Sequence, residues 1–229
     1  MPQSTEPLDH RVLSAAKRRK RMLAKLSDAA LRVVARNGLE GVTVDAVIQE
    51  AGVSRGTFYK YYDATSSLIA AVGAELAEDL ILTVSPALQT YDDPAERLAT
   101  GFRLVMQCAR ETPLLPGFLI RAGWPATDLV PAFSARVGAN LAAGIEQARF
   151  RNASLMVASA FVGGAVIGMM ATLTEDDGGP EDDSVAAAML LLSFGLPEYE
   201  AIAIANLPLP QTTYRNGLFA RTRGRDVTT

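Results

Sequence analysis

Between Arg55 and Tyr61 the chain places two cations, a threonine hydroxyl and two phenols within seven residues. Cationic side chains bind phosphate oxygens, and hydroxyl groups form hydrogen bonds with both phosphates and base edges. Arg55 is the best candidate for reading a base, because a guanidinium can pair with O6 and N7 of guanine together. Thr57 and Tyr61 can reach bases or thymine methyl groups. This cluster therefore favours binding to double-stranded DNA in the major groove.

Two short helices around a tight turn are predicted to hold this cluster in place. Thr43 and Ser54 are suitable N-caps of these helices, because a hydroxyl can accept a hydrogen bond from the free amides of a first turn. Gly52 suits the left-handed residue that ends the first helix. The second helix is expected to reach about Tyr62, with Phe58 four residues earlier on its buried side. The opposite side then exposes the polar residues.

The segment GVSRGTFYKYY, which follows a longer helix ending ARNG at Gly38, resembles the tetracycline-repressor (TetR) family of bacterial transcription regulators. The likeness covers roughly residues 20–80. It implies an all-α fold, with an N-terminal three-helix helix-turn-helix DNA-binding head and a C-terminal helical bundle for ligand binding and dimerisation. It also implies that five residues face DNA, with the phenol at position 59 on a phosphate: Arg55, Gly56, Thr57, Tyr59 and Tyr61.

Four further residues are expected to contribute to DNA binding. Thr43, Ser54 and Lys60 suit contacts with the phosphate backbone. Thr65 stands at the start of the fourth helix, where members of the family often carry a lysine, so a cationic phosphate contact is missing. The free amides of that helix can still bind a phosphate. The alternative interpretation of the whole segment is a buried helical hairpin with incidental polar residues.

The charges are distributed unevenly along the chain. Residues 1–62 hold 11 Lys and Arg against 6 Asp and Glu, residues 63–210 hold 7 against 18, and residues 211–229 hold 4 against 1. A basic head on an acidic body concentrates attraction for DNA at one end of the molecule. Random variation of surface charge also produces such a split, so it supports DNA binding only modestly.

The composition excludes several classes of protein. The 229 residues include one cysteine, Cys108, and one histidine, His10, which exclude an internal disulfide, a cysteine metal cluster and most histidine chemistry. No catalytic residue, metal or cofactor is therefore expected, and the chain is not expected to be an enzyme. The first 20 residues lack the apolar region of a signal peptide. The expected location is the bacterial cytoplasm, in association with the nucleoid.

The chain divides into a flexible arm (residues 1–16), the DNA-binding head (17–64), the ligand-binding and dimerisation domain (65–206) and a flexible basic tail (207–229). The run KRRKR at 17–21 leads into the head, where its cations can lie along phosphates or enter the minor groove. A solvated helix start is the alternative interpretation of this run. The arginines of the tail are expected either to touch DNA or to have no partner.

Apolar residues at helical spacing predict further helices over residues 65–85, 94–111 and 131–149, with short helices and turns between Pro113 and Pro131. In the TetR family the fourth helix links the head to a ligand cavity, so the resemblance implies a cavity in this domain. The residues expected to line it, each of which also fits an ordinary core position, are Phe102, Met106, Phe118, Trp124, Phe133 and Met169. Alternative partners for an acidic ligand are Arg103, Arg110 and Arg121.

Residues 153–173 form an uncharged stretch that is long enough to span a bilayer. It contains a GxxxG spacing at Gly164 and Gly168, with basic residues before the stretch and acidic residues after it. One hypothesis is a membrane anchor. The other is a helix buried on one side by its own bundle and on the other by a second subunit. The richness in Ala, Ser, Gly and Thr, together with the DNA-binding segment, favours the second hypothesis.

A second apolar helix is predicted over residues 181–194, joined to the first by an acidic loop at 175–183, and a short helix follows at 198–206. The resemblance implies that two such helix pairs, one from each subunit, form a four-helix bundle. The residues expected at this dimer interface are Phe161, Gly164, Gly168, Val185, Met189 and Leu192.

These expectations describe a sequence-specific DNA-binding transcription regulator, namely a homodimeric repressor that a small, largely apolar ligand releases from DNA. Two heads related by a two-fold axis require a palindromic operator. The expected partners are this operator, a second copy of the chain and an unknown small-molecule effector, without a membrane. Two alternatives are a membrane-anchored protein that spans at 153–173 and a DNA-binding protein with no small-molecule effector.

Overall fold

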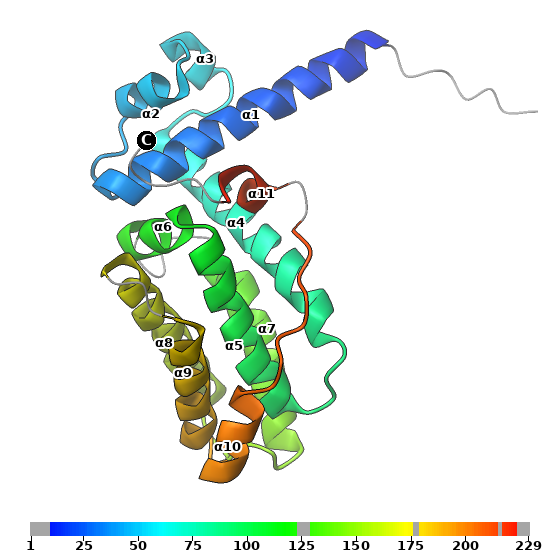
Figure 1. Cartoon of the computed structure of the whole chain (residues 1–229). Coiled ribbons are helices and arrows are strands. Elements are labelled where there is room, and N and C mark those ends of the chain that lie inside the picture. Colours follow the sequence, from blue (N-terminus) through cyan, green and yellow to red (C-terminus); the bar gives the residue numbers. More distant parts are fainter. Residues whose placement is uncertain (1–9, 123–128, 176–178, 215–216, 224–229) are drawn as a thin grey trace, which may run out of the picture.

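The computed structural model describes residues 10–122, 129–175, 179–214 and 217–223. Within these ranges the chain forms eleven helices and no strand (Figure 1), so the expected all-α fold is confirmed. In chain order the helices are α1 (His10–Asn37), α2 (Val44–Ala51), α3 (Arg55–Tyr59), α4 (Thr65–Leu88), α5 (Pro94–Glu111), α6 (Leu114–Ala122), α7 (Leu129–Glu146), α8 (Leu155–Glu175), α9 (Pro180–Ser193), α10 (Glu198–Ala205) and α11 (Leu218–Thr222).

Helix α1 is the scaffold of the head. Its buried side chains, which include Leu26, Ala30 and Val33, recur at helical spacing and pack against α2 and α4. Gly38 follows the helix with φ 70°, the left-handed conformation that glycine adopts without a steric cost. The helix begins at His10, so the expected arm over residues 1–16 is wrong for residues 10–16. This stretch is free of glycine and proline, and α1 therefore continues through it.

The body is a bundle in which α5 is central and contacts α4, α7, α8, α9 and α10. In the Pro-rich segment after α5, residues 114–122 form the short helix α6, which accommodates Pro116 because it lies in the first turn, where a missing amide hydrogen costs no internal hydrogen bond. Helix α6 lies under the C-terminal half of α1 (Figure 1). At this contact a Cβ atom at Gly117 would lie 3.2 Å from the Cβ of Ala35, so glycine permits the close approach of head and body.

Helix α8 is apolar all round but is buried on one side only. The residues that it buries in the bundle recur every four positions: Ala158, Val162, Val166 and Met170. Its segment Leu155–Leu173, with a mean hydropathy of 1.9, is long and apolar enough to cross a membrane, but only 28% of that window is buried. One such helix is weak support for a membrane span. The bundle accounts for one apolar face of α8 and leaves the other uncovered.

Part of the predicted flexible tail (residues 207–229) is folded. Residues 218–222 form helix α11, which packs against α1 and α4 (Figure 1). Leu218, Phe219 and Thr222 are buried there. Charge and proline content suggested flexibility, whereas the two apolar residues find a site on helices that lie far away in sequence. The prediction of a flexible tail is therefore wrong for residues 217–223.

Candidate DNA-binding surface and ligand cavity

The helix-turn-helix is held by the three local features that its sequence predicts. The Thr43 hydroxyl accepts a hydrogen bond from the Ala46 amide at 3.1 Å, and the Ser54 hydroxyl accepts one from the Thr57 amide, also at 3.1 Å. Gly52 adopts φ 56° and ψ 51° between the two helices. Each cap satisfies amides or carbonyls that a helix end leaves free. Both predicted N-caps and the predicted left-handed glycine are thus confirmed.

The second helix of the motif, α3, is shorter than predicted. It ends at Tyr59 instead of about Tyr62, and Lys60 is its C-terminal cap. The amides of Tyr61 and Tyr62 both donate to the carbonyl of Phe58, which closes a turn and directs the chain into α4. Phe58 itself is fully buried and anchors α3 to the core.

The predicted DNA-contacting residues, here together called the DNA-binding surface, are exposed or half-buried. Thr43, Ser54, Arg55, Gly56 and Lys60 are exposed, and the Tyr59 side chain is 51% exposed. A Cβ atom at Gly56 would meet nothing within 4 Å, so the backbone at this position is open to a ligand. Thr57, Tyr61 and Thr65 are half-buried at the edge of the same surface.

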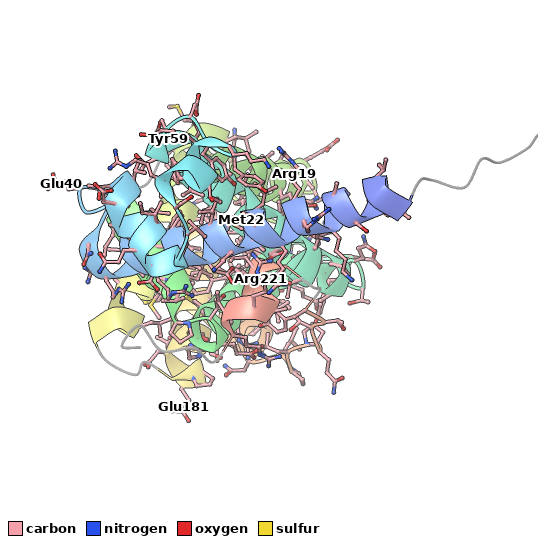
Figure 2. The ribbon with its side chains drawn as sticks, turned by 90° about the horizontal axis from the view of Figure 1, so that it is seen from above. Arg19, Met22, Glu40, Tyr59, Glu181 and Arg221 are labelled. Carbon is pink, nitrogen blue, oxygen red and sulfur yellow. The ribbon has the colours of Figure 1, made fainter. Side chains whose placement is uncertain are left out.

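The basic run of α1 joins this surface. The guanidinium of Arg19 lies over the ring of Tyr61, with its central carbon 5.6 Å from the ring centroid. Arg19 and Tyr59 lie on the same side of α1 (Figure 2). The other four cations of the run at 17–21 are exposed. The sequence motif KRRKR indicates these charges, but the contact between Arg19 and Tyr61 was not predicted because it joins α1 to the turn after α3.

Arg55, the expected base reader, is held by a partner that the sequence analysis did not identify. Its Nη2 atom donates to Oδ1 of Asp45 on α2 at 2.6 Å. The hydrogen bond and charge of Asp45 raise the pKa of Arg55. Both side chains are exposed, and exposed ion pairs are weak, so the guanidinium remains accessible to another partner.

A three-residue ion cluster attaches α2 to α1. Glu50 accepts hydrogen bonds from Arg32, at 2.6 Å, and from Arg36. Burial raises the pKa of Glu50, but the hydrogen bonds and charges of the two arginines outweigh it and hold the pKa below its ordinary value. The ionised carboxylate therefore helps to hold the helix-turn-helix on its scaffold.

The body contains a cavity of about 360 Å³ between four helices. Its buried walls are apolar and include Leu98, Phe102, Val105 and Val166. The full lining consists of Leu80, Ile81, Val84, Ser85 and Leu88 of α4, Gln89 at the C-terminal cap of α4, Arg97, Leu98, Gly101, Phe102 and Val105 of α5, Arg136, Val137, Ala139 and Asn140 of α7, and Val162 and Val166 of α8. A volume of this size suits a small ligand.

Polar groups gather at one part of this lining. Arg97 Nε donates to Oδ1 of Asn140 at 2.9 Å, and Arg136 Nη1 donates to the Ser85 hydroxyl at 2.9 Å. Arg136 is exposed and Arg97 is half-buried, so this polar part faces the solvent side of the cavity. Neither guanidinium forms an ion pair with a carboxylate within the ranges that the structure describes. Both therefore retain donors for a ligand.

The cavity differs in its lining from the sequence prediction. Phe102 lines it as expected. Met106 and Phe118 are instead fully buried core residues, and Met169 is half-buried outside the lining, because the packing of distant helices decides which apolar side chains meet the cavity. Trp124 and the side chain of Phe133 lie outside the described part of the chain.

The three arginines proposed as alternative ligand partners have other contacts. Arg103 Nη1 donates to the carbonyl of Leu207 at 2.6 Å, and Arg121 donates to the carbonyl of Arg36 at 2.8 Å. Arg110 forms an ion pair with the buried carboxylate of Asp183. These contacts join parts of the fold, and the lining arginines that the prediction missed are Arg97 and Arg136.

An uncovered apolar face extends over α8 and α9, which contact each other (Figure 1). All six residues predicted at the dimer interface are exposed on it, at Phe161, Gly164, Gly168, Val185, Met189 and Leu192. The Met189 side chain is 64% exposed. A Cβ atom at Gly164 or Gly168 would meet nothing within 4 Å, so another backbone can approach closely there. Nothing within this chain's described residues covers the face.

These features together define a helix-turn-helix transcription regulator with a separate helical domain. Residues 26–72 match the sequence profile of bacterial regulatory proteins of the tetR family, and residues 93–207 match the tetracyclin repressor-like C-terminal domain. The chain belongs to the tetR family, and the resemblance inferred from GVSRGTFYKYY is confirmed. In the ranges described, no group of three or more His, Cys, Asp or Glu side chains is placed to hold a metal ion.

Individual relatives match mainly the head. The chain is 33% identical over 69 residues to the uncharacterized HTH-type transcriptional regulator YvdT of Bacillus subtilis, which is 30% of this chain and 36% of YvdT. It is 33% identical over 75 residues to the HTH-type transcriptional regulator BetI of Brucella canis, or 33% of this chain and 38% of BetI. The chain thus spans little more than a third of the length of these curated relatives.

A solved structure matches the whole fold. RolR in complex with the ligand resorcinol superimposes with a TM-score of 0.66 and 28% sequence identity. The superposition covers 86% of this chain and 100% of the RolR chain. The likeness therefore extends through the body, beyond the head that the curated relatives match.

Proposed function

We propose that this protein is a homodimeric repressor that binds a palindromic DNA operator and is released from it by a small, largely apolar ligand. The observation that carries the proposal is the exposed surface of α3, where Arg55, Tyr59 and Lys60 stand beside the basic run of α1. Cations and phenols on a short, capped helix suit phosphates and base edges in a major groove. The expected location is the bacterial cytoplasm, on the nucleoid.

The uncovered face of α8 and α9 supports the dimer. Large apolar side chains such as Phe161, Val185 and Met189 are more than half exposed there. Contiguous exposed apolar surface of this kind marks an interaction site, and symmetric pairing of one face with its copy is the commonest solution. Two paired copies present two α3 helices, which requires two half-sites in inverted orientation. A membrane is the competing occupant of the face, because α8 is apolar enough to span one.

The cavity supports the effector. Its apolar wall suits an aromatic or aliphatic body, and Arg97 and Arg136 suit a hydroxyl or an acidic group at the polar part of the lining. Resorcinol, the ligand of the related RolR, is an aromatic ring with two hydroxyl groups. Small phenols and aromatic acids are therefore the first ligands to test. Each acid is paired with its uncharged amide, which has nearly the same shape but no charge.

Footprinting on genomic fragments tests the DNA-binding part of the proposal. The expected result is a protected palindrome that purified protein binds without detergent, as a dimer by light scattering. The triple variant Arg55→Ala, Tyr59→Ala and Lys60→Ala is expected to lose the footprint. Its side chains are exposed, so its thermal unfolding serves as a control for folding. A monomer with no preference for any duplex contradicts the proposal.

Release by a ligand is tested separately on the same operator. An effector is expected to raise the melting temperature of the protein and to lower its affinity for the operator in parallel. Filling the cavity with a bulkier side chain is expected to abolish both effects. A ligand screen that produces no shift favours the alternative of a DNA-binding protein without an effector, while the footprint stands.

A further inference from the structure

Helix α11 forms a connection between the head and the body that the proposed function does not use. The residues from Gly217 to Arg223, here named the C-terminal clasp, lie in the angle between α1 and α4 (Figure 1). Leu218, Phe219 and Thr222 are each at most 1% exposed. A terminal segment with this degree of burial is a fixed part of the structure.

The clasp is fitted to α4 at one buried carboxylate. The amide of Phe219 donates to Oδ2 of Asp79 at 2.9 Å, so Asp79 caps the first turn of α11 from another helix. A Cβ atom at Gly217 would lie 1.8 Å from Oδ1 of Asp79, a distance that excludes every other residue type without a rearrangement. The contact with Asp79 therefore requires glycine at position 217 and the free amide of a first helical turn at position 219.

One side chain of the clasp reaches the DNA-binding head. Arg221 Nε donates to Oδ1 of Asp28 on α1 at 2.9 Å, and its Nη2 donates to Oε1 of Glu75 on α4 at 2.8 Å. A guanidinium is planar and presents its donors in a fixed fork, so it sets the angle between the two carboxylates. Arg221 lies on the opposite side of α1 from Tyr59 and Arg19 (Figure 2). Its loss therefore removes no contact from the DNA-binding surface.

The clasp adds a polar attachment between α1 and the body to the direct packing of α1 on α4 and α6. At α6, Gly117 packs on Ala35 and Arg121 donates to the carbonyl of Arg36. A further attachment at a distance from α6 restricts the rotation of α1 about that contact. Asp28 and Ala35 are seven residues apart, or about 10 Å along a helix that rises about 1.5 Å per residue. That separation is sufficient to fix the axis of α1.

We propose that the C-terminal clasp fixes the angle between head and body, and that it thereby selects the spacing between operator half-sites that the dimer binds. This proposal rests on the proposed function, because spacing has a meaning only for a dimer on a palindrome. Consecutive base pairs lie about 3.4 Å apart, and a full turn takes about 10 base pairs, so each added pair both shifts and rotates a half-site. A rigid pair of heads loses contacts when a half-site is shifted and rotated, whereas heads that can pivot adjust to the new position.

Two arginines of the clasp form a matched pair of variants. Arg221→Ala removes the link to Asp28 of the head, whereas Arg223→Ala removes a link to Glu111 of α5, at 2.6 Å, and leaves the head untouched. Both changes remove one positive charge from the same short segment. Asp28→Asn removes the negative charge from the other side of the head link and does not alter α11, which keeps the test valid if Arg221→Ala does not fold.

The first measurement is binding to operators whose central spacer is lengthened or shortened by one and two base pairs. The wild type and Arg223→Ala are expected to lose about tenfold in affinity per changed pair, the order of one lost base contact. Arg221→Ala and Asp28→Asn are expected to lose about threefold or less in affinity per changed pair, so their preference for one spacer length is weaker. Wild-type spacing ratios in both head-link variants overturn the proposal.

The second measurement is made without DNA. A spin label on Lys20→Cys, an exposed position of α1, reports the distance between the two heads of a dimer. The buried thiol of Cys108, whose pKa is raised by burial to about 11, is a poor competitor for the label. A broader distance distribution in Arg221→Ala than in Arg223→Ala is expected, and equal distributions contradict the clasp. Absence of any distance in the wild type instead contradicts the proposed dimer.

Discussion

The DNA-binding surface and the cavity are built in opposite ways. The surface comes from one stretch between Thr43 and Thr65, with Arg19 added, and its groups are polar and mostly exposed. The cavity comes from four helices between Leu80 and Val166, and its walls are apolar and buried. Local caps position the first, whereas the packing of distant helices shapes the second. Substitutions should therefore separate DNA binding from ligand response, with α4 as the shared element.

The largest expected effect comes from removing the anchor of α3. Phe58→Ala should destabilise the head by about 3–5 kcal/mol, because Phe58 is fully buried and the site cannot collapse around the loss. Operator binding should disappear while the body still binds ligand. Phe102→Ala is the matched change in the cavity wall and should affect ligand binding first. Denaturant unfolding, operator binding and calorimetry with ligand check both variants.

The separation fails in one clear case. If Phe102→Ala remains folded and yet loses operator binding as fully as Phe58→Ala does, the head depends on the cavity wall. If both variants lose ligand binding equally, the body depends on the anchor of α3.

Within the DNA-binding surface, base reading and phosphate contact should separate in turn. Arg55→Ala should reduce discrimination against a changed guanine by roughly 5- to 150-fold. Lys60→Ala should weaken binding to all sequences and lower the slope of affinity against salt by about 1. Binding assays over several salt concentrations, on operator and altered duplexes, check both. Asp45→Asn, which releases Arg55 from its ion pair, should retain the wild-type sequence preference.

These assignments also have a defined contrary result. If Arg55→Ala and Lys60→Ala weaken every duplex to the same extent with equal salt slopes, Arg55 is a phosphate contact and not a base reader.

Changes of size at Val166 should affect the cavity alone. Val166→Phe places a larger side chain in a lining position and should lower ligand affinity by about tenfold or more, at a cost of about 1–3 kcal/mol in stability. Val166→Ala widens the same position and should admit a bulkier analogue. Operator affinity without ligand should change by less than about threefold in both variants. Calorimetry with ligands of increasing size checks that Val166→Phe and Val166→Ala shift the preferred ligand size in opposite directions. If both variants prefer the same size, the ligand binds elsewhere.

The contrast between the two sites also explains what the sequence could predict. Thr43, Gly52 and Ser54 form hydrogen bonds with residues three or four positions away, so the sequence alone indicated the helix-turn-helix and its caps. The exposed apolar residues of α8 and α9 were predictable because both helices carry more apolar residues than one buried face requires.

Contacts between distant segments were not predictable in this way. Arg97 and Arg136 meet the cavity only because α5 and α7 pack beside α4, and Phe118 looks equally suitable by type but lies in the core. Arg221 finds Asp28 193 residues away, which no periodicity indicates. The end of α3 at Tyr59 likewise reflects the direction of α4, since the tyrosines that follow would tolerate a longer helix.

The smallest expected effect concerns the action of acid on the attachment of α2 to α1. Burial raises the pKa of Glu50, and Arg32 and Arg36 lower it further than burial raises it, so the folded pKa is below the ordinary value of 4.5. A group of this kind stabilises the folded state fully above its unfolded pKa and loses that contribution as the pH falls through the folded pKa. The attachment of α2 to α1 should therefore weaken below about pH 4.5.

Hydrogen exchange of α2 between pH 6 and pH 4 checks this expectation, with rates corrected for intrinsic exchange. Glu50→Gln should make the amides of α2 exchange faster at pH 6. It should also make their corrected exchange rate less dependent on pH, because no carboxylate is left to titrate at this position. Glu40→Gln is the control, since Glu40 is exposed in the same head and has no ion pair within the described ranges. If Glu50→Gln and Glu40→Gln give the same pH profile as the wild type, the arginine cluster does not hold α2, and the caps and buried apolar residues suffice.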